Sequence, residues 1–351
     1  MNLAQLAKDL GLEFKGPPDY PIDGLGDVEM LAPGESPRDH RLYFVESRAV
    51  LKRHPEAVAR GAVLTTPDLA ASFERALLAP AGGARRALIA LLKKFDRTPA
   101  FPPGISAGAE VHAGARIAVS ASILPGAVVM EGALVGERCV VYPGAVLEAF
   151  SEIGEGTVLF PGVVLGHHCV IGKEGIVHGG TVIGADGFGF FDDARGRHKI
   201  PQVGNVVIGD HVELGSGCTV DRATIESTTI GDHTKLDDQV HVAHNCRLGR
   251  FIYIAGNSGI AGSVVMEDGV MISGMVAVKD HLRIAAGTIV MGQSGVAQDT
   301  EPKTMYFGTP ARPARQMHKM HAALERLPEL LNKVRRLEER IKELEAVPAR
   351  S

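Results

Sequence analysis

The chain is poor in aromatic residues and in cysteine. It has 351 residues with no tryptophan, 5% aromatic residues and four cysteines, none of which forms a CxxC pair. This spacing excludes a zinc ribbon and a dense disulfide framework. With so few aromatic side chains, the core has to be built from small and branched aliphatic residues.

Long apolar runs and an excess of positive charge are also missing. No run approaches the roughly 20 apolar residues that a membrane-spanning helix needs. The N-terminal MNLAQLAKDLGLEF predicts an amphipathic helix and lacks the basic-then-apolar order of a signal peptide. The formal net charge of -4 disfavours a nucleic-acid partner, which would require a basic face. Together these features predict a cytoplasmic protein without a transmembrane segment.

What the chain has instead is glycine, 42 of 351 residues, and a period of six. Every sixth residue is aliphatic over fourteen successive positions in the range 105–183. The period lapses between 184 and 206, returns at three positions in 208–220, and continues over twelve positions in 230–296. Neither a helix, with 3.6 residues per turn, nor a simple alternating strand has this period.

A period of six is typical of a short strand followed by a turn, stacked so that each aliphatic side chain lies inside a prism. Three hexads make a coil of 18 residues, so the hexads predict a parallel β-helix of roughly ten coils. Glycine often follows the aliphatic residue, as at Gly166, Gly172, Gly231 and Gly249. We expect these glycines to form the corners, where unusual backbone angles are needed.

The flanks of the repeat differ from it. We expect an N-terminal α/β domain at 1–102, with helical stretches at 47–61 and 71–95. The β-helix domain follows at 103–302 and includes a loop at 184–206, and a helical extension occupies 303–351.

In the C-terminal extension, one apolar face holds Met317, Met320, Leu324 and Leu327, Pro328 interrupts it, and a charged amphipathic helix follows. From residue 303 onward there are eleven Lys or Arg against six Glu.

The chemistry-bearing residues concentrate in the segment 235–249, KLDDQVHVAHNCRLG. Its polar candidates are Asp237, Asp238, Gln239, His241, His244 and Asn245. Gly262 lies 18 residues after His244, hence one coil above it, and His281 lies two coils plus one residue away. A neutral imidazole beside a carboxylate suits a general base, and a glycine N–H one coil away suits an oxyanion donor.

Other interpretations of these histidines remain open. They could be surface residues without a role, or ligands of a zinc ion. The separation of His241 and His244 across the buried Val242 disfavours them as joint ligands.

The loop at 184–206 concentrates aromatic and basic side chains. Its candidates are Phe188, Phe190, Phe191, Arg195, Arg197, His198 and Lys199. Such a loop could cover a ligand and offer cations to a phosphate, or it could be an insertion without a function.

Several ordered motifs resemble one family. GADGFGF, KIPQVGNVVIGD, TVDRA, KLDDQVHVAHN and GIAGS resemble the bacterial UDP-3-O-acylglucosamine N-acyltransferases of lipid A synthesis, nearly from end to end. The resemblance implies a mainly β fold with a left-handed parallel β-helix, a small N-terminal α/β domain and C-terminal α-helices. It also implies a homotrimer with active sites between neighbouring β-helices.

The activity that the resemblance implies is transfer of an (R)-3-hydroxyacyl chain from acyl carrier protein to the 2-amino group of UDP-3-O-acylglucosamine, without a covalent intermediate. No cofactor is implied beyond the phosphopantetheine of the carrier protein, and no metal. The implied catalytic residues are His244 as base, Asp237 as its orienting carboxylate and the Gly262 N–H as oxyanion donor. The implied substrate-binding residues are His281, Phe44, Ser47, Asp186, Phe188, Phe190, His198, Lys199, Gln202, Asp238, Gln239 and Asn245.

This chain departs from the family pattern at three places, one of which is Gly295, where an apolar residue can limit the acyl channel. The family's Asp-Asn-Gln is Asp237, Asp238 and Gln239 here, and its Phe, Asn and Tyr at spacings of three are Phe44, Ser47 and Val50. Two alternatives therefore stand: a related hexapeptide acyltransferase acting on another sugar nucleotide, and a non-catalytic trimeric scaffold. Basic residues of the C-terminal extension, with Arg312 and Arg315 as candidates, would suit an acidic carrier protein.

Overall fold

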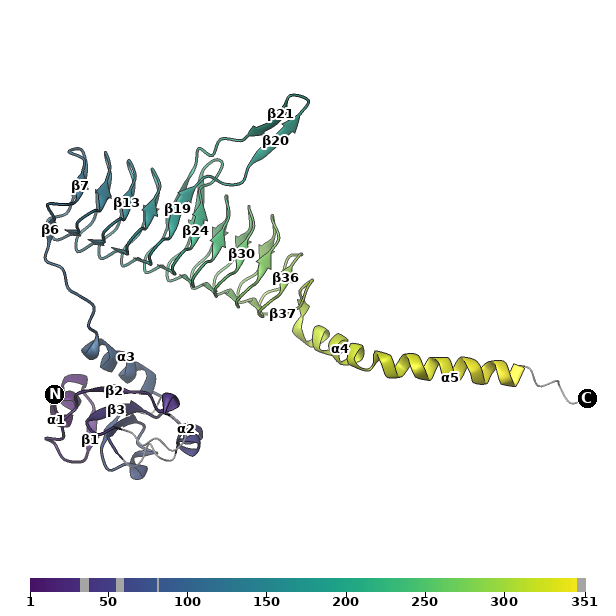
Figure 1. Ribbon diagram of the computed structural model, residues 1–351, viewed down its shortest axis with the longest axis horizontal. Coiled ribbons are helices and arrows are strands. Elements are labelled where there is room, and N and C mark those ends of the chain that lie inside the picture. Colours follow the sequence, from purple (N-terminus) through teal and green to yellow (C-terminus); the bar gives the residue numbers. More distant parts are fainter. Residues whose placement is uncertain (32–37, 55–59, 81, 346–351) are drawn as a thin grey trace, which may run out of the picture. The chain divides into compact units, whose positions relative to one another are not determined.

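The computed structural model describes residues 1–31, 38–54, 60–80 and 82–345 (Figure 1). The chain divides between Ala100 and Phe101 into two compact units. Each unit has its own hydrophobic core, and the candidate chemistry lies mainly in the second.

The N-terminal unit is a five-stranded sheet with helices packed against it. Its elements are α1 (Leu3–Leu10), β1 (Glu13–Lys15), β2 (Gly24–Gly26), β3 (Arg41–Phe44), α2 (Arg48–Arg53), β4 (Ala62–Thr65), β5 (Ala76–Leu78) and α3 (Ala84–Phe95), with single 3-10 turns at Val28–Met30 and Ala70–Ser72. The strand order is β1-β5-β4-β3-β2, with β1 antiparallel. The sequence prediction of an N-terminal amphipathic helix is confirmed by α1, whose Leu3 and Leu6 are buried.

One helix prediction in this unit is partly wrong. The stretch 71–95 is helical only from Ala84, because residues Ala76–Leu78 form strand β5 between β1 and β4. Ala76 and Leu77 are fully buried there. Pairing with strands distant in the sequence thus overrides the local helical pattern.

The second unit is a prism of three parallel sheets, and the predicted parallel β-helix is confirmed (Figure 1). The first sheet holds β7 (Glu110–Val111), β10 (Val128–Val129), β13 (Val146–Leu147), β16 (Val164–Leu165), β19 (Val182–Ala185), β24 (Thr219–Asp221), β27 (His241–Val242), β30 (Gly259–Ile260), β33 (Ala277–Val278) and β36 (Gly295–Val296). The second holds β8 (Arg116–Ile117), β11 (Leu134–Val135), β14 (Glu152–Ile153), β17 (Val170–Ile171), β22 (Asn205–Ile208), β25 (Ser227–Ile230), β28 (Arg247–Leu248), β31 (Val265–Met266) and β34 (Arg283–Ile284). The third holds β6 (Gly104–Ile105), β9 (Ser122–Ile123), β12 (Val140–Val141), β15 (Val158–Leu159), β18 (Ile176–Val177), β23 (Glu213–Leu214), β26 (Lys235–Leu236), β29 (Tyr253–Ile254), β32 (Met271–Ile272), β35 (Ile289–Val290), β37 (Met305–Phe307) and the antiparallel β38 (Arg312–Pro313).

The ten strands of the first sheet match the expected ten coils. Each periodic aliphatic residue lies in a two- to four-residue strand and, except for Ile183 and Val220, ends it. Away from the first coils, these residues are buried in one continuous core. The four cysteines are buried and free in the same core. Burial raises the pKa of the Cys246 thiol to about 11, so this thiol is chemically inert at neutral pH.

The glycines that follow the aliphatic residues do not adopt the unusual backbone angles that were predicted for them. The left-handed backbone lies three residues after the aliphatic residue, as at Glu174 (φ 51) and His233 (φ 59), and not at the glycine that follows it. That glycine is needed for close approach between coils. A Cβ on Gly231 would lie 2.6 Å from the carbonyl carbon of Gly249 in the next coil, and one on Gly172 2.7 Å from that of Gly209.

The predicted loop at 184–206 leaves the prism as a two-stranded hairpin, β20 (Phe190–Asp193) and β21 (Gly196–Lys199). Figure 1 shows this hairpin projecting from the wall of the β-helix between β19 and β24. The second irregularity in the hexad period, between β24 and β25, forms a shorter loop at 222–226.

The C-terminal end closes the prism and continues as two helices. Strand β37 still pairs with β35, so the last coil extends to Phe307. Helix α4 (Ala314–Glu325) packs on this coil through Met317, which is buried near Gly308. Helix α5 (Leu327–Glu345) follows after Arg326, and Pro328 lies in its first turn, where proline is tolerated.

Candidate active site

His244 lies between two glycines that belong to different parts of the fold. Strand β27 pairs with β30 so that His244 and Gly262 occupy equivalent places in successive coils, as the spacing of 18 predicted. A Cβ on Gly262 would lie 2.8 Å from Cε1 and 2.9 Å from Nε2 of His244. On the other side, a Cβ on Gly187, at the base of the hairpin loop, would lie 2.6 Å from Cβ of His244. The ring is therefore held in a slot that only glycine permits.

The hydrogen bonds around Asn245 determine the tautomer of His244. Oδ1 of Asn245 accepts from the backbone N–H of Thr224 (3.1 Å), and its Nδ2 donates to the carbonyl of Ile225 (3.3 Å). Nδ1 of His244 lies 3.1 Å from the same Oδ1, which is an acceptor only. In the neutral ring, Nδ1 therefore carries the proton, and the lone pair is on Nε2, on the side of Gly262.

Asp221 is the carboxylate on the same sheet as this histidine. It is 8% exposed and its Oδ2 lies 3.8 Å from Nε2 of His241, whose Nδ1 is 2.7 Å from the hydroxyl of Thr219. Burial raises the pKa of the Asp221 carboxyl, while His241 and His244 oppose that shift. Asp221 is thus a buried carboxyl group on the same side of the prism as His244.

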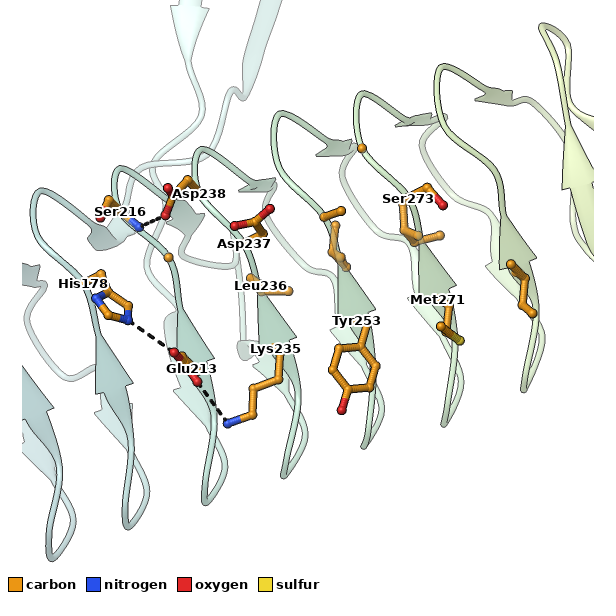
Figure 2. A pocket seen from close by; sticks show the side chains of 16 residues that line it. His178, Glu213, Ser216, Lys235, Leu236, Asp237, Asp238, Tyr253, Met271 and Ser273 are labelled. Carbon is orange, nitrogen blue, oxygen red and sulfur yellow. Dashed lines mark hydrogen bonds and ion pairs between the residues drawn. The ribbon is translucent and has the colours of Figure 1, made fainter. Parts of the chain in front are cut away.

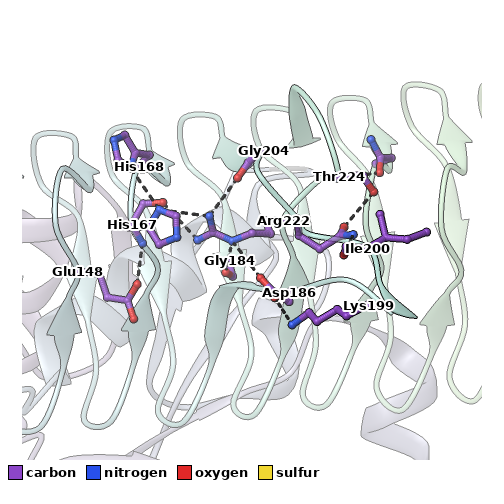
Figure 3. A network of polar contacts seen from close by, with 12 residues as sticks. Glu148, His167, His168, Gly184, Asp186, Lys199, Ile200, Gly204, Arg222 and Thr224 are labelled. Carbon is purple, nitrogen blue, oxygen red and sulfur yellow. Dashed lines mark hydrogen bonds and ion pairs between the residues drawn. The ribbon is translucent and has the colours of Figure 1, made fainter. Parts of the chain in front are cut away.

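Arg222 anchors the hairpin loop at 184–206, the loop whose Gly187 lies beside His244 (Figure 3). It is 2% exposed, and its Nε donates to the carbonyl of Gly184 (2.8 Å) while its guanidinium also donates to the carbonyl of Gly204 (3.1 Å). These glycines stand at the two ends of the hairpin excursion. The guanidinium also lies 3.3 Å from Nδ1 of His167, whose pKa is lowered by burial and by the Arg222 charge. One buried arginine therefore closes the base of the loop.

The basic side chains of the loop are engaged within the loop itself. Lys199 is paired with Asp186 (Figure 3), and Nε2 of His198 lies 2.9 Å from Oδ1 of Asp193. Arg197 pairs in the same way with Asp192, through two bonds of 2.9 Å. The expectation that these cations are offered to a phosphate therefore requires these pairs to open.

Other predicted loop residues divide into exposed and buried ones. Phe188 is 85% exposed, and its ring meets that of Phe190 edge-on at 5.1 Å between centroids. Gln202 is buried instead. Its Nε2 donates to the carbonyl of Ile200 (3.0 Å), and its Oε1 accepts from the hydroxyl of Thr224 (2.9 Å). Gln202 thus links the hairpin loop to the shorter loop at 222–226.

Asp237 lies on the third sheet, away from the sheet that carries His244. Its Oδ2 accepts from the N–H of Gly256 (3.0 Å), and Oδ1 of Asp238 accepts from that of Ser216 (2.7 Å). Within the described residues no hydrogen bond or ion pair joins Asp237 to His244. The predicted pair is thus not formed inside one chain, because the two residues follow strands of different prism faces.

The face with Asp237 carries a groove of about 820 Å³ (Figure 2). A ladder of polar side chains crosses it: Nε2 of His178 lies 3.3 Å from Glu213, which lies 3.5 Å from Nζ of Lys235. Tyr253 and Met271 continue the row over the next two coils.

The remaining predicted residues of the β-helix occupy corners. Gln239 (φ 59), Asn245 (φ 60) and His281 (φ 58) all have left-handed backbone. His281 is in register with Ser263 and Asn245, its N–H donates to the carbonyl of Gly262 (3.0 Å), and its side chain is exposed. The expectation that His244 and His281 share a prism side is met, with His281 displaced by one residue toward the corner.

In the N-terminal unit, Phe44 lines a cavity of about 510 Å³ together with Glu46 and Val50. The hydroxyl of Ser47 accepts from the N–H of Val50 (3.3 Å) and thereby caps helix α2. Ser47 thus has a structural role besides the substrate contact that the resemblance implies.

Two kinds of feature are not found over residues 1–31, 38–54, 60–80 and 82–345. No three His, Cys, Asp or Glu side chains there are grouped to hold a metal ion. Nor is any helix in those ranges both long and apolar enough to cross a bilayer.

Sequence reasoning missed Asp221, Arg222 and Gly187 as members of the site. The first two belong to the TVDRA motif, next to the four-residue slip in the hexads, and that slip was the available signal.

The fold and the site define a class: a hexapeptide-repeat β-helix protein that places one tautomerically fixed histidine beneath a tethered loop.

Comparison with known proteins gives the family. A UDP-3-O-acylglucosamine N-acyltransferase of Pseudomonas aeruginosa (strain UCBPP-PA14) is 36% identical over 341 residues, 97% of this chain and 94% of that protein. A protein of the same name from Methylorubrum extorquens (strain PA1) is 44% identical over 146 residues, so that the match spans 42% of either chain. No family model matches. The chain belongs to the UDP-3-O-acylglucosamine N-acyltransferase family.

Two solved structures resemble part of this chain. The UDP-N-acetylglucosamine acyltransferase from Campylobacter jejuni superimposes with a TM-score of 0.49 and 23% identity, covering 60% of this chain and 73% of that one. The Francisella novicida UDP-N-acetylglucosamine acyltransferase gives a TM-score of 0.48 and 26% identity, covering 60% and 69%.

Proposed function

We propose that the protein transfers an (R)-3-hydroxyacyl chain from acyl carrier protein to the 2-amino group of UDP-3-O-(3-hydroxyacyl)glucosamine, a step of lipid A biosynthesis in the cytoplasm. The observation that carries this proposal is the placement of the His244 imidazole, with Nδ1 facing Oδ1 of Asn245 and Nε2 beside the backbone of Gly262. The named relative that matches 97% of the chain supports the choice of substrates.

The mechanism uses this geometry directly. Nε2 of His244 takes the proton of the amino group as its nitrogen attacks the thioester carbonyl of the donor. The Gly262 N–H stabilises the tetrahedral oxyanion. When the intermediate collapses, the carbon–sulfur bond breaks and the leaving thiolate takes the proton back from His244. Asn245 holds the tautomer throughout, since its Oδ1 accepts from Nδ1.

Two carboxylates are available to steady the imidazolium. Asp221 does so from within the same chain, as a buried group on the same sheet. The predicted role of Asp237 requires another copy, because Asp237 and His244 are on different faces of their own prism. In the homotrimer that we propose, Asp237 of one copy faces His244 of its neighbour across the groove of Figure 2.

This pairing between copies has a direct test. Chains with His244→Ala and chains with Asp237→Ala are each inactive, and they are unfolded, mixed in equal amounts and refolded. In a cyclic trimer, about one quarter of the interfaces would then combine an intact His244 with an intact Asp237. Recovery of activity near that fraction supports pairing between copies, and no recovery would refute it.

The donor site is proposed at the basic C-terminal region. Arg312 and Arg315 are exposed at the beginning of helix α4. Acyl carrier protein is acidic, so exposed arginines there would attract it.

The N-terminal unit suggests a second candidate for the acceptor substrate, because two residues of the family pattern differ there. Ser47 is engaged as a helix cap and Val50 is apolar, so neither supplies the amide and the aromatic ring of the family pattern. This favours, as the alternative, a related acyltransferase acting on another sugar nucleotide. Phe44 is the one member of the pattern that remains, and it lines the cavity of that unit.

The experiment is a mass-spectrometric assay of the purified protein with acyl carrier proteins bearing 3-hydroxyacyl chains of several lengths. UDP-3-O-acylglucosamine and UDP-N-acetylglucosamine are compared as acceptors. A diacylated product formed only from the first acceptor supports the proposal. Acylation of the second acceptor alone would support the alternative, an acyltransferase acting on another sugar nucleotide. No product with either acceptor would support the non-catalytic scaffold.

A further inference from the structure

The return leg of the hairpin loop, residues 200–205, is bound to the shorter loop at 222–226. Three successive backbone N–H groups of the return leg, from Val203 onward, donate to carbonyls of the shorter loop at 3.0 Å each. The side chain of Gln202 lies at this junction and is 7% exposed. The position of the shorter loop therefore depends on the position of the return leg.

The amide of Gln202 fixes the direction of its hydrogen bond to Thr224. Its Nε2 donates to the carbonyl of Ile200 at 3.0 Å, so the other amide atom, Oε1, is an acceptor only. The hydroxyl of Thr224 lies 2.9 Å from this Oε1 and donates to it. Gly189, on the outgoing leg, leaves room for the amide, because a Cβ there would lie 2.9 Å from Nε2. Both legs of the hairpin loop thus position Gln202, and Gln202 holds the hydroxyl of Thr224.

Thr224 in turn contacts the amide that lies beside His244. Its backbone N–H donates to Oδ1 of Asn245 at 3.1 Å, and the following carbonyl, that of Ile225, accepts from Nδ2 at 3.3 Å. Two backbone groups of the shorter loop therefore set the orientation of the Asn245 amide. Nδ1 of His244 lies 3.1 Å from the same Oδ1. A continuous series of hydrogen bonds thus runs from the hairpin loop to the imidazole of His244.

The two orientations of the Asn245 amide have opposite effects on this imidazole. With Oδ1 toward Nδ1, the neutral ring carries its proton on Nδ1 and has its lone pair on Nε2, beside Gly262. With the amide turned over, Nδ2 would donate to Nδ1, and the proton would be on Nε2. A ring in that tautomer cannot accept a proton at Nε2. The groups that hold the shorter loop therefore decide whether His244 can act as a base.

We propose that Gln202 and Thr224 are positioning residues, which make the lone pair at Nε2 of His244 depend on the hairpin loop being in place. While the return leg contacts the shorter loop, the Gln202–Thr224 hydrogen bond keeps the Asn245 amide in the orientation described. When the hairpin loop lifts, this bond opens and the amide is free to turn over. Proton transfer is thereby confined to the state with the loop in place. This role rests on the proposed function of His244, and neither residue touches the reacting atoms.

The protonation site of His244 is measured by NMR on the full-length protein labelled with ¹⁵N in its histidine rings. The ring-nitrogen shifts distinguish the two tautomers, and the signals of His244 are those absent from His244→Ala. Thr224→Val removes the hydroxyl and keeps the backbone N–H that binds Asn245. At a pH where the ring is neutral, we expect the proton on Nδ1 in the wild type and a several-fold lower ratio of Nδ1–H to Nε2–H in Thr224→Val. An unchanged ratio would overturn the proposal.

The turnover of the same variant separates positioning from stability. In Thr224→Val, kcat should fall at least about tenfold, while KM for the sugar nucleotide stays within about twofold. Thr224→Ser keeps the hydroxyl and should recover most of the rate; a serine variant as slow as the valine variant would contradict the role of the hydrogen bond.

Thr157→Val is the matched control. The hydroxyl of Thr157 also donates to a protein oxygen, the carbonyl of Gly172 at 2.8 Å, but this residue lies between β14 and β15, on the other two sheets. Since Thr157 is fully buried, its variant should melt at a lower temperature and still turn over at the wild-type rate. An equal loss of kcat in Thr157→Val would show a general effect of stability and refute the positioning role.

A second variant tests whether the two residues act through one bond. Gln202→Met removes the amide and keeps the length of the side chain, so it should change the tautomer and kcat as Thr224→Val does. The double variant should be no slower than either single one, because each substitution removes the same hydrogen bond. Losses that multiply in the double variant would show that the two residues act separately, against the proposal.

The two measurements also separate this inference from the proposed reaction. A tautomer that changes in Thr224→Val, in a protein whose wild type transfers no acyl chain, would refute the reaction and leave the positioning of the ring standing. An active wild type whose Thr224→Val variant keeps both its rate and its tautomer would refute the positioning and leave the reaction.

Discussion

Adding one methyl group at Gly262 should displace the imidazole of His244, the proposed base, without removing any hydrogen-bonding group. Alanine keeps the backbone N–H that is proposed to hold the oxyanion. Its Cβ would lie 2.8 Å from Cε1 of His244, whereas ordinary contact begins at 3.4 Å, so the ring has to move by at least 0.6 Å. A misplacement on the order of 1 Å costs about 10²-fold in rate, so we expect kcat to fall by roughly 10- to 10²-fold.

Gly259→Ala is the matched control. It lies three residues earlier on strand β30, and a Cβ there would have no atom within 4 Å. Its kcat should remain within about twofold of the wild type. A second test from the opposite side is Gly187→Ala, whose Cβ would meet Cβ of His244 at 2.6 Å. That atom cannot rotate away, so the loop must shift.

The assay is steady-state acyl transfer at saturating donor and acceptor, with a thermal melt of each variant beside it. If Gly262→Ala turned over at the wild-type rate with an unchanged melt, the slot would not position the base, and the reasoning would be refuted. An equal loss of kcat in Gly259→Ala would show that the substitution disturbs the coil as a whole rather than the imidazole of His244.

Three further predictions follow from the site. Burial raises the pKa of the Asp221 carboxyl above its ordinary 3.8, so this carboxyl ionises more readily in the unfolded chain. The cost to stability is absent below pH 3.8, grows as pH rises toward the folded pKa and is constant above it. Asp221→Asn should therefore melt at the same or a higher temperature at neutral pH, with the gain disappearing at about pH 3, while acyl transfer falls. A lower melting temperature at neutral pH would contradict this sign. Arg222→Met leaves the buried carbonyls of Gly184 and Gly204 without their donor and should cost about 3 kcal/mol in denaturant unfolding, with early proteolysis of the hairpin loop; a loss below about 1 kcal/mol would refute its anchoring role. Arg315→Glu should raise KM for acyl carrier protein several-fold at low salt and much less at high salt, leaving KM for the sugar nucleotide unchanged; no change in the donor KM would remove this arginine from the carrier surface.

The β-helix could be predicted from the sequence because each hexad repeats one environment. An aliphatic residue at Val242 or Ile260 serves the same core as those one coil away, so the period alone fixes strand, register and coil. The place of Gly262 above His244 follows from the same count.

Other features depend on atoms that no period encodes. The corner angle falls three residues after the aliphatic residue, where His233 and Glu174 adopt it, so the glycines near the aliphatic positions were assigned the wrong reason. Strand β5 was predicted as helix because its partners β1 and β4 lie far away in the sequence.

The site itself was predicted in part. The spacing identified His244 and Gly262, but the proton on Nδ1 is decided by Thr224, which orients the amide of Asn245. Asp221 directly follows the periodic Val220, but the hexads slip by four residues after it, so the count of residues does not relate it to His244. The period does place Asp237 and His244 on different faces, because the aliphatic residues next to them, Leu236 and Val242, are one hexad apart.

The most direct test of the central claim is the turnover of His244→Ala with UDP-3-O-acylglucosamine and 3-hydroxyacyl carrier protein. General-base catalysis contributes about 10²- to 10⁴-fold, so the variant should lose at least 10²-fold in kcat while its melting temperature and oligomeric state match the wild type. A His244→Ala protein that forms the diacylated product at near wild-type rate would contradict the account.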